Sequence, residues 1–98
     1  MIRYRRKARQ ELWEAVTFYE QQPPGLGAEF DQGVAAILEK AVETPGQFQR
    51  VDPMLRKARF QRFNFFIYFT AISEGHIQVV AIVHARRSPE WIQRRLGE

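Results

Sequence analysis

Apolar residues recur every three or four positions over the first half of the chain, which is the period of an amphipathic helix. The first such stretch ends at Pro23-Pro24-Gly25, and the second runs from about Leu26 to Val42 and is followed by Pro45-Gly46. The pattern predicts two helices that form an antiparallel helical hairpin. Their predicted buried positions are Ala8, Leu12, Ala15, Val16 and Tyr19 in the first helix, and Phe30, Val34, Ile37, Leu38 and Ala41 in the second.

After Pro53 the pattern changes to that of β-strands. Residues from Met54 to Phe63 mix basic and apolar positions, as on an exposed strand. Residues from Phe65 to Ile72 are almost all apolar, which is typical of a central strand covered on both faces. Ser73-Glu74-Gly75 is a turn sequence, and Ile77 to Val83 is again apolar and β-branched. The last two runs therefore predict a β-hairpin.

Short elements are predicted near both ends. Ile2-Arg3-Tyr4-Arg5 alternates apolar with basic residues, as a half-exposed strand does. Ser88-Pro89-Glu90 supplies an N-cap, a first-turn proline and a first-turn acid, which predicts a short helix that ends near Leu96-Gly97. The elements together predict a single α+β domain over residues 1–98. We expect an N-terminal strand, the helical hairpin packed on one face of a mostly antiparallel four-stranded sheet, and a short C-terminal helix.

The composition excludes several classes of site. With 98 residues the chain has room for one small domain, and it contains no cysteine, which excludes disulfides, thiolate metal sites and cysteine nucleophiles. It has no paired-histidine motif, glycine-rich phosphate loop or Gly-x-Ser-x-Gly elbow, so we expect neither a metal nor a cofactor. No run approaches the roughly 18 apolar residues of a membrane span. No signal peptide is evident, so we expect a cytoplasmic protein without membrane partners.

Charge is distributed unevenly along the chain. Residues 1–9 contain five basic residues and no acid, residues 10–49 contain seven acids and one base, and residues 50–98 contain nine bases and four acids. Basic ends around an acidic middle indicate one positive face, which suits an anionic partner such as nucleic acid or an acidic protein segment. The alternative is two solvated basic surfaces without a target.

The strongest candidate site follows the last predicted strand, in His84-Ala85-Arg86-Arg87-Ser88-Pro89-Glu90-Trp91. Arginine offers a planar fork for phosphate or carboxylate, and the indole offers a face for a base or a guanidinium. Arg95 lies one helical turn from Trp91, where it could stack on the indole. Alternatively, Trp91 anchors the terminal helix and the arginines are solvated. His84, expected on the same face as Val80 and Ile82, is either an acid–base group or a partner of nearby backbone.

A second candidate is the basic row formed by Lys57 and Arg59, together with Arg56 and Arg62. Such a row neutralises phosphates, pairs with acids of a protein ligand, or keeps a sheet edge soluble. The neighbouring aromatic residues are predicted to pack in the core rather than to stack bases; they are Phe60, Phe63, Phe65, Phe66, Tyr68 and Phe69.

Five short motifs follow one another in a fixed order: Ala8-x-x-Glu11-Leu12; Pro24-Gly25-Leu26-Gly27 with Phe30 after it; Thr44-Pro45-Gly46; Arg62-Phe63-x-Phe65-x-Ile67-Tyr68; and Val83-His84-x-Arg86-Arg87-x-Pro89-x-Trp91-x-x-Arg94. With the order of elements, they resemble the RelE/ParE toxin superfamily, and its ParE-like branch more closely. The resemblance spans nearly the whole chain.

The resemblance implies the growth-inhibiting toxin of a bacterial type II toxin–antitoxin system, a kind of module also associated with plasmid stabilization. A small cognate antitoxin would neutralise it. ParE-like members poison DNA gyrase, and here the contact surface would comprise Arg59, Arg62, Arg86, Arg87, Trp91, Arg94 and Arg95.

RelE-like members of the superfamily instead cleave mRNA in the ribosomal A site. The residues that would carry this catalysis are Lys57, Arg59, His84 and Arg87. Phe66 stands where that branch usually has an arginine, and Trp91 stands where it has a C-terminal tyrosine. The catalytic set is therefore incomplete, which favours binding over nuclease activity. A third alternative is a non-toxic relative that binds only an antitoxin.

Antitoxin contacts are expected at an open sheet edge, which a partner strand can join, and on apolar surface of the helical hairpin. Trp13 and Phe18 lie outside the main apolar stripe of the first helix. They are either an exposed patch for the antitoxin or core residues on a wider stripe.

Overall fold

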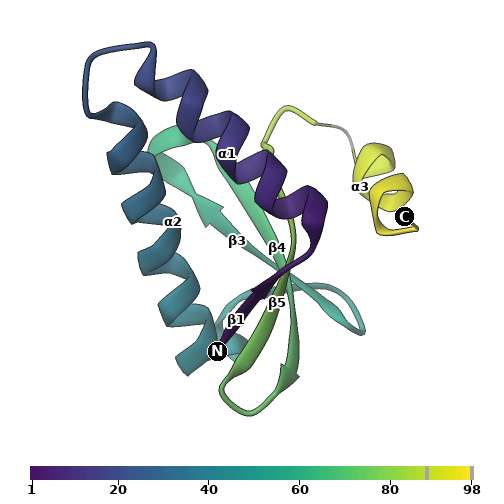
Figure 1. Ribbon diagram of the computed structural model, residues 1–98. Helices are drawn as coiled ribbons and strands as arrows, with labels where there is room; N and C mark the ends of the chain where they lie inside the picture. Colours follow the sequence, from purple (N-terminus) through teal and green to yellow (C-terminus); the bar gives the residue numbers. More distant parts are fainter. Residues whose placement is uncertain (88, 98) are drawn as a thin grey trace.

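The computed structural model describes residues 1–87 and 89–97 and places three helices beside one β-sheet (Figure 1). The predicted helical hairpin, central β-hairpin and terminal helix are confirmed, whereas the Ser88 N-cap lies outside the described residues. The helices are α1 (Arg6–Glu20), α2 (Leu26–Glu43) and α3 (Pro89–Leu96). The strands are β1 (Ile2–Tyr4), β2 (Gln49–Asp52), β3 (Leu55–Phe60), β4 (Phe65–Ser73) and β5 (His76–His84).

The sheet has five strands in the order β1-β5-β4-β3-β2 rather than the four that were expected. β1 runs parallel to β5, and the other neighbours are antiparallel. The additional strand is β2, which pairs only with β3 and so forms an edge. Its sequence Gln49-Arg50-Val51-Asp52 is mostly polar, because an edge strand needs little apolar pattern.

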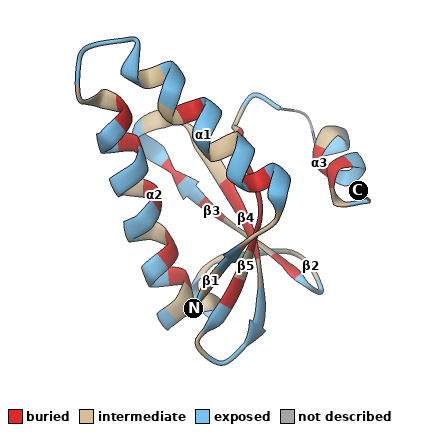
Figure 2. Cartoon of the chain, viewed as in Figure 1, coloured by how far each residue is buried: buried red, intermediate tan, exposed pale blue. Residues whose placement is uncertain are grey.

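The helical hairpin packs over the sheet, whereas the short helix α3 lies to one side in this view (Figures 1 and 2). The helical hairpin packs on one face, over a core built around fully buried Phe30, Phe69 and Ile67. On the opposite face α3 contributes Ile92 to a smaller cluster with Tyr68, Val83 and neighbouring residues. Figure 2 shows these buried positions as red segments along the central strands and the inward sides of the helices.

A bulge in β5 changes which residues share a face. Tyr68 pairs with Ala81, but the next residue of β4, Phe69, pairs with Val79, so Val80 is the extra residue. Val80 therefore lies in the α3-side cluster, whereas Ile82 lies in the core beneath the hairpin. The expectation that Val80 and Ile82 share one face is wrong for this reason.

The turn between α1 and α2 is fixed by one carboxylate and one close approach. Glu20 accepts hydrogen bonds from the N–H groups of Gly25 and Gly27, both at 3.0 Å. Gly25 has a φ of 92°, in the left-handed region that favours glycine. A Cβ at Gly27 would lie 2.5 Å from the Val16 carbonyl oxygen, so only glycine allows the two helices to pack this closely.

Within residues 1–87 and 89–97, no helix combines the length and the apolar character that crossing a bilayer requires. The same part of the chain contains no group of three or more His, Cys, Asp or Glu side chains arranged to hold a metal ion.

Candidate functional site

Helix α3 is attached to the sheet by an apolar side and exposes a basic one. Ile92 is buried, and Trp91 and Leu96 are half-buried against the α3-side cluster. Arg86, Arg87 and Arg94 are exposed. Trp91 thus anchors the helix and also remains partly accessible at its surface.

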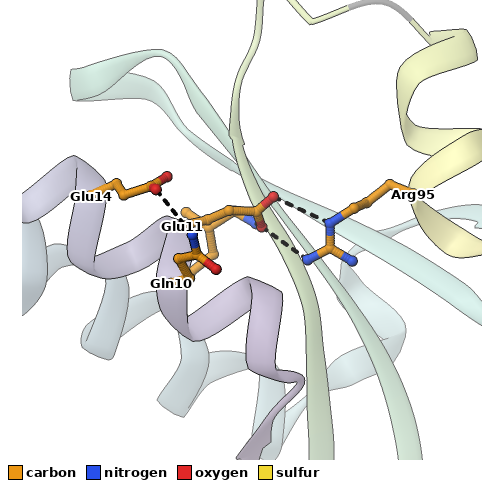
Figure 3. A network of polar contacts seen from close by, with 5 residues as sticks. Gln10, Glu11, Glu14 and Arg95 are labelled. Atoms are coloured by element: carbon orange, nitrogen blue, oxygen red, sulfur yellow. Dashed lines mark hydrogen bonds and ion pairs between the residues drawn. The ribbon is translucent and has the colours of Figure 1, made fainter. Parts of the chain in front are cut away.

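An ion pair between α1 and α3 fixes the position of the terminal helix (Figure 3). The Arg95 Nε and Nη2 atoms lie 3.3 Å from the two carboxylate oxygens of Glu11. Arg95 is only 5% exposed. The expectation that Arg95 belongs to a contact surface is therefore wrong, because its guanidinium is committed to Glu11 inside the molecule.

Glu11 also completes the backbone pairing of β5. Strand β1 ends at Tyr4, and its last backbone hydrogen bond to β5 runs from the Arg5 N–H to the Val79 carbonyl. Beyond that point, the Glu11 carboxylate accepts the Ile82 N–H at 3.0 Å. One carboxylate thereby joins α1, β5 and α3. Unpaired backbone donors are costly to bury, so this contact supports the edge where β1 stops.

The arginine that stacks on Trp91 is Arg87, not Arg95. The Arg87 guanidinium carbon lies 4.9 Å from the centre of the indole. Arg87 follows the end of β5, and its backbone N–H donates to the His84 carbonyl at 3.0 Å. This turn brings a cation and an aromatic face together at the surface, where such a pair contributes about 0.5–1 kcal/mol.

A groove of about 670 Å³ lies between α1 and α3, at the end of β5. Tyr19, Phe65 and Val83 give it apolar walls, while Lys7, Arg87 and Arg94 place basic groups along it. Glu11, Glu14 and Arg95 also line it, so the ion pair of Figure 3 forms part of its wall. Burial raises the pKa of the Tyr19 phenol above its ordinary value of 10.0, so this tyrosine stays neutral at physiological pH.

The basic row on β3 lies on the α3 side of the sheet. Lys57 pairs with Tyr68 and Arg59 pairs with Phe66, and both aromatic residues belong to the α3-side cluster. The Lys57 ammonium lies 4.3 Å from the Phe66 ring centre and the Arg59 guanidinium carbon 5.8 Å from it. Arg59 also donates to the Asn64 side-chain oxygen at 2.9 Å. Lys57 and Arg59 thus both lie close to one aromatic ring.

His84 lies on the other face of the sheet. It pairs with Phe65, whose ring packs against the core under the hairpin and lies 5.3 Å from the imidazole centre. The His84 Nδ1 accepts the Arg86 N–H at 3.2 Å. The four nuclease candidates therefore do not gather on one face, because Lys57 and Arg59 are separated from His84 by the sheet.

Arg62 is also separate from the terminal arginines. It forms an ion pair with Glu29 of α2, and its guanidinium lies 5.0 Å from the Phe63 ring centre. The Arg62 side chain therefore lies against the helical hairpin, although it remains 58% exposed.

Trp13 and Phe18 form an exposed apolar patch on α1. Their side chains are 69% and 56% exposed, so they are not core residues on a wider stripe. With Glu14, Thr17 and Gln21 they line a hollow of about 290 Å³. The Phe18 ring meets Tyr19 edge-on, with ring centres 5.2 Å apart, which continues the patch toward the larger groove.

Sequence reasoning missed Glu11 and Lys7 as groove residues. Glu11 was considered only as part of the Ala8-x-x-Glu11-Leu12 motif, and Lys7 only as one of the basic residues at positions 1–9. The sequence did contain an indication of Glu11, because Arg95 shares the apolar side of the terminal helix with Ile92. An arginine that is buried with such a side requires a carboxylate partner.

Comparison with solved structures supports the fold. A chain from the "Chromosomal ParDE TA system from P. aeruginosa" is similar at a TM-score of 0.72 and 18% identity, over 87% of this chain and 95% of that one. The isolated E. coli RelE toxin is similar at a TM-score of 0.52 and 12% identity, over 96% of this chain and 93% of that one. A comparison with curated protein sequences found no match.

A family model gives the more specific result. The model described as the ParE toxin of the type II toxin-antitoxin system, parDE, matches residues 2–89. The match includes the helical hairpin and all five strands, and it ends where α3 begins. The chain therefore belongs to the ParE toxin family of type II toxin–antitoxin systems.

Proposed function

We propose that residues 1–98 act as a single toxin domain in the cytoplasm and inhibit DNA gyrase by binding to it. The contact surface consists of Arg86, Arg87, Trp91 and Arg94, with Arg59 on the adjoining sheet face. The observation that carries this proposal is the Arg87–Trp91 pair on a helix held in place by the buried Glu11–Arg95 ion pair. A surface presented by a fixed helix loses little conformational entropy on binding.

Inhibition by binding has more support than nuclease chemistry. Acid–base cleavage of RNA needs its groups close to one 2′-hydroxyl, but Lys57 and Arg59 lie across the sheet from His84. Trp91 carries no titratable proton. An aromatic–cation surface without a converging acid and base is suited to recognising a protein partner.

A cognate antitoxin neutralises the toxin by covering two adjoining surfaces of α1. Trp13 and Phe18 provide an apolar patch of the kind that receives one side of an amphipathic helix. The groove beyond it adds Lys7, Arg87 and Arg94, which suit acidic side chains of the same partner. An antitoxin seated there would shield part of the gyrase contact surface.

Purified components test this proposal. Supercoiling by gyrase is measured with increasing protein, and ribosome-bound mRNA is examined for cleavage in parallel. We expect lost supercoiling, intact mRNA, and a loss of potency of about tenfold or more for Arg87→Ala/Arg94→Ala. Arg50→Ala, at an exposed base on β2, is the matched control and should retain potency. A-site cleavage without any effect on gyrase would overturn the proposal in favour of a ribosome-dependent endonuclease.

A further inference from the structure

The β1–α1 junction contains a basic patch that the proposed gyrase surface does not use and of which the proposed antitoxin surface uses only Lys7. Arg3, Arg6, Lys7 and Arg9 are exposed, and Arg5 is half-buried. Within residues 1–87 and 89–97, neither Arg3 nor Arg6 forms an ion pair. The nearest acid along the chain is Glu11, which is already committed to Arg95. Arg3 and Arg6 therefore carry positive charge that no ion pair in this part of the chain neutralises.

The local backbone adds to this charge. Helices commonly begin with acidic residues, because the first turn exposes N–H groups and the positive end of the helix dipole. The first turn of α1 contains no acid, and no side chain caps it at Arg5. Basic side chains therefore occupy the positive end of the α1 dipole, and such a helix start attracts phosphate groups.

The patch is continuous with the basic side of α3. Lys7 lines the same groove as Arg87 and Arg94, and Figure 1 shows the first turn of α1 next to α3. Seven of the eleven acids lie between residues 10 and 49, and six of these seven occupy exposed positions of α1 and α2. Basic residues therefore predominate in β1 and the first turn of α1, and acidic residues in the rest of α1 and in α2.

We propose that the basic patch at Arg3–Arg9 binds the phosphate backbone of duplex DNA. This inference rests on the proposed function, because the proposed target, gyrase, acts on duplex DNA. Four of the five cations are arginines, whose forked guanidinium groups match phosphate oxygens in pairs. The toxin thus contacts both the enzyme and its substrate, through different residues.

Direct binding to a fluorescein-labelled duplex of mixed sequence, about 20 bp long, tests the proposal without gyrase. The affinity is followed by anisotropy over a range of salt concentrations. Each phosphate contact adds about 0.9 to the slope of log affinity against log salt, so Arg3→Gln/Arg6→Gln should lower the slope by about 1.8 and the affinity by roughly tenfold. Arg3→Lys/Arg6→Lys should keep most of the slope. Circular dichroism verifies that each variant is folded.

The control variant Lys40→Gln/Arg50→Gln removes the same charge from exposed positions outside the patch. It should leave the slope of log affinity against log salt unchanged. The proposal is overturned if this control lowers the slope as much as Arg3→Gln/Arg6→Gln does. It is also overturned if the wild type does not bind the duplex at low salt. Equal affinity for poly-glutamate of matched charge also overturns it, in favour of an acidic protein partner. If Arg3→Gln/Arg6→Gln reduces duplex binding while the wild type fails to inhibit gyrase, the DNA site stands and the proposed function fails.

Discussion

Glu11 on α1 and Arg95 on α3, which are 84 residues apart in sequence, form the ion pair that holds the terminal helix against the sheet. Their side chains are only 17% and 6% exposed. Because Glu11 also accepts the Ile82 N–H, the pair connects the terminal helix to the edge of β5 as well as to α1. Trp91 and the exposed Arg94, both on α3, therefore owe their position to two charges that are mostly shielded from solvent.

Replacing Arg95 with alanine should destabilise the fold and release α3. Removing one partner of a buried pair leaves the other charge without compensation, at a cost of about 3 kcal/mol. The free energy of unfolding from urea titration measures the loss, and hydrogen exchange in Ile92–Leu96 should accelerate. In Glu11→Ala/Arg95→Ala the loss should be smaller than the sum of the single losses. Strictly additive losses would show that the two residues do not act as a pair.

Gly27→Ala should destabilise the helical hairpin. The added Cβ would meet the Val16 carbonyl oxygen at 2.5 Å, so α1 and α2 must move apart at a cost of about 1–3 kcal/mol. Gly46→Ala is the matched control, since nothing lies within 4 Å of its added Cβ. Thermal unfolding compares the two variants. Equal melting temperatures would mean that the close approach at Gly27 carries no strain.

Trp13→Ala/Phe18→Ala should weaken antitoxin binding without weakening the fold. Both side chains are exposed, so their removal costs little packing, whereas a partner helix would lose apolar contact worth about 2 kcal/mol or more. Calorimetric titration with the cognate antitoxin measures the change. Met54→Ala, at a residue that is 68% exposed on another part of the surface, should retain full affinity. Undiminished binding by the double variant would place the antitoxin elsewhere.

Stability should fall in alkaline solution. Burial raises the pKa of Tyr68 and Tyr19 above the ordinary 10.0, so the folded chain keeps phenol protons that the unfolded chain releases. The free energy of unfolding therefore decreases as the pH rises above 10.0, while the tyrosine contribution is fully present below it. Urea titrations across this range should show a shallower decrease for Tyr68→Phe. An unchanged decrease in that variant would show that Tyr68 does not contribute.

The sequence pattern was sufficient for the elements that have strong periodicity. The helical hairpin was recognisable because Phe30, Val34, Leu38 and Ala41 repeat at helical spacing and are all buried. The hairpin of β4 and β5 was recognisable from its continuous apolar character. Strand β2 was missed because it is an edge strand that pairs only with β3. Such a strand can be polar, so its sequence does not show the apolar pattern by which strands are recognised.

The arrangement of the site was less predictable for a different reason. Which arginine stacks on Trp91 depends on the turn after β5, and which arginine is buried depends on Glu11, a residue distant in sequence. The bulge at Val80 reverses the alternation of side chains between the two faces of β5. A prediction that assumes strict alternation along the strand therefore assigns residues on one side of the bulge to the wrong face. Contacts between distant segments, rather than local propensities, thus decide which basic residues reach solvent.

The Glu11 contact to Ile82 has a consequence for how the isolated protein behaves in concentrated solution. Exposed strand edges recruit edges of neighbouring molecules and so seed aggregates. Past the end of β1, the Ile82 N–H of β5 donates to the Glu11 carboxylate and is therefore not available to pair with a strand from another molecule. The Glu11 carboxylate, which anchors α3, therefore also blocks strand pairing at this edge of β5. A toxin released from its complex is thereby protected against self-association through this edge.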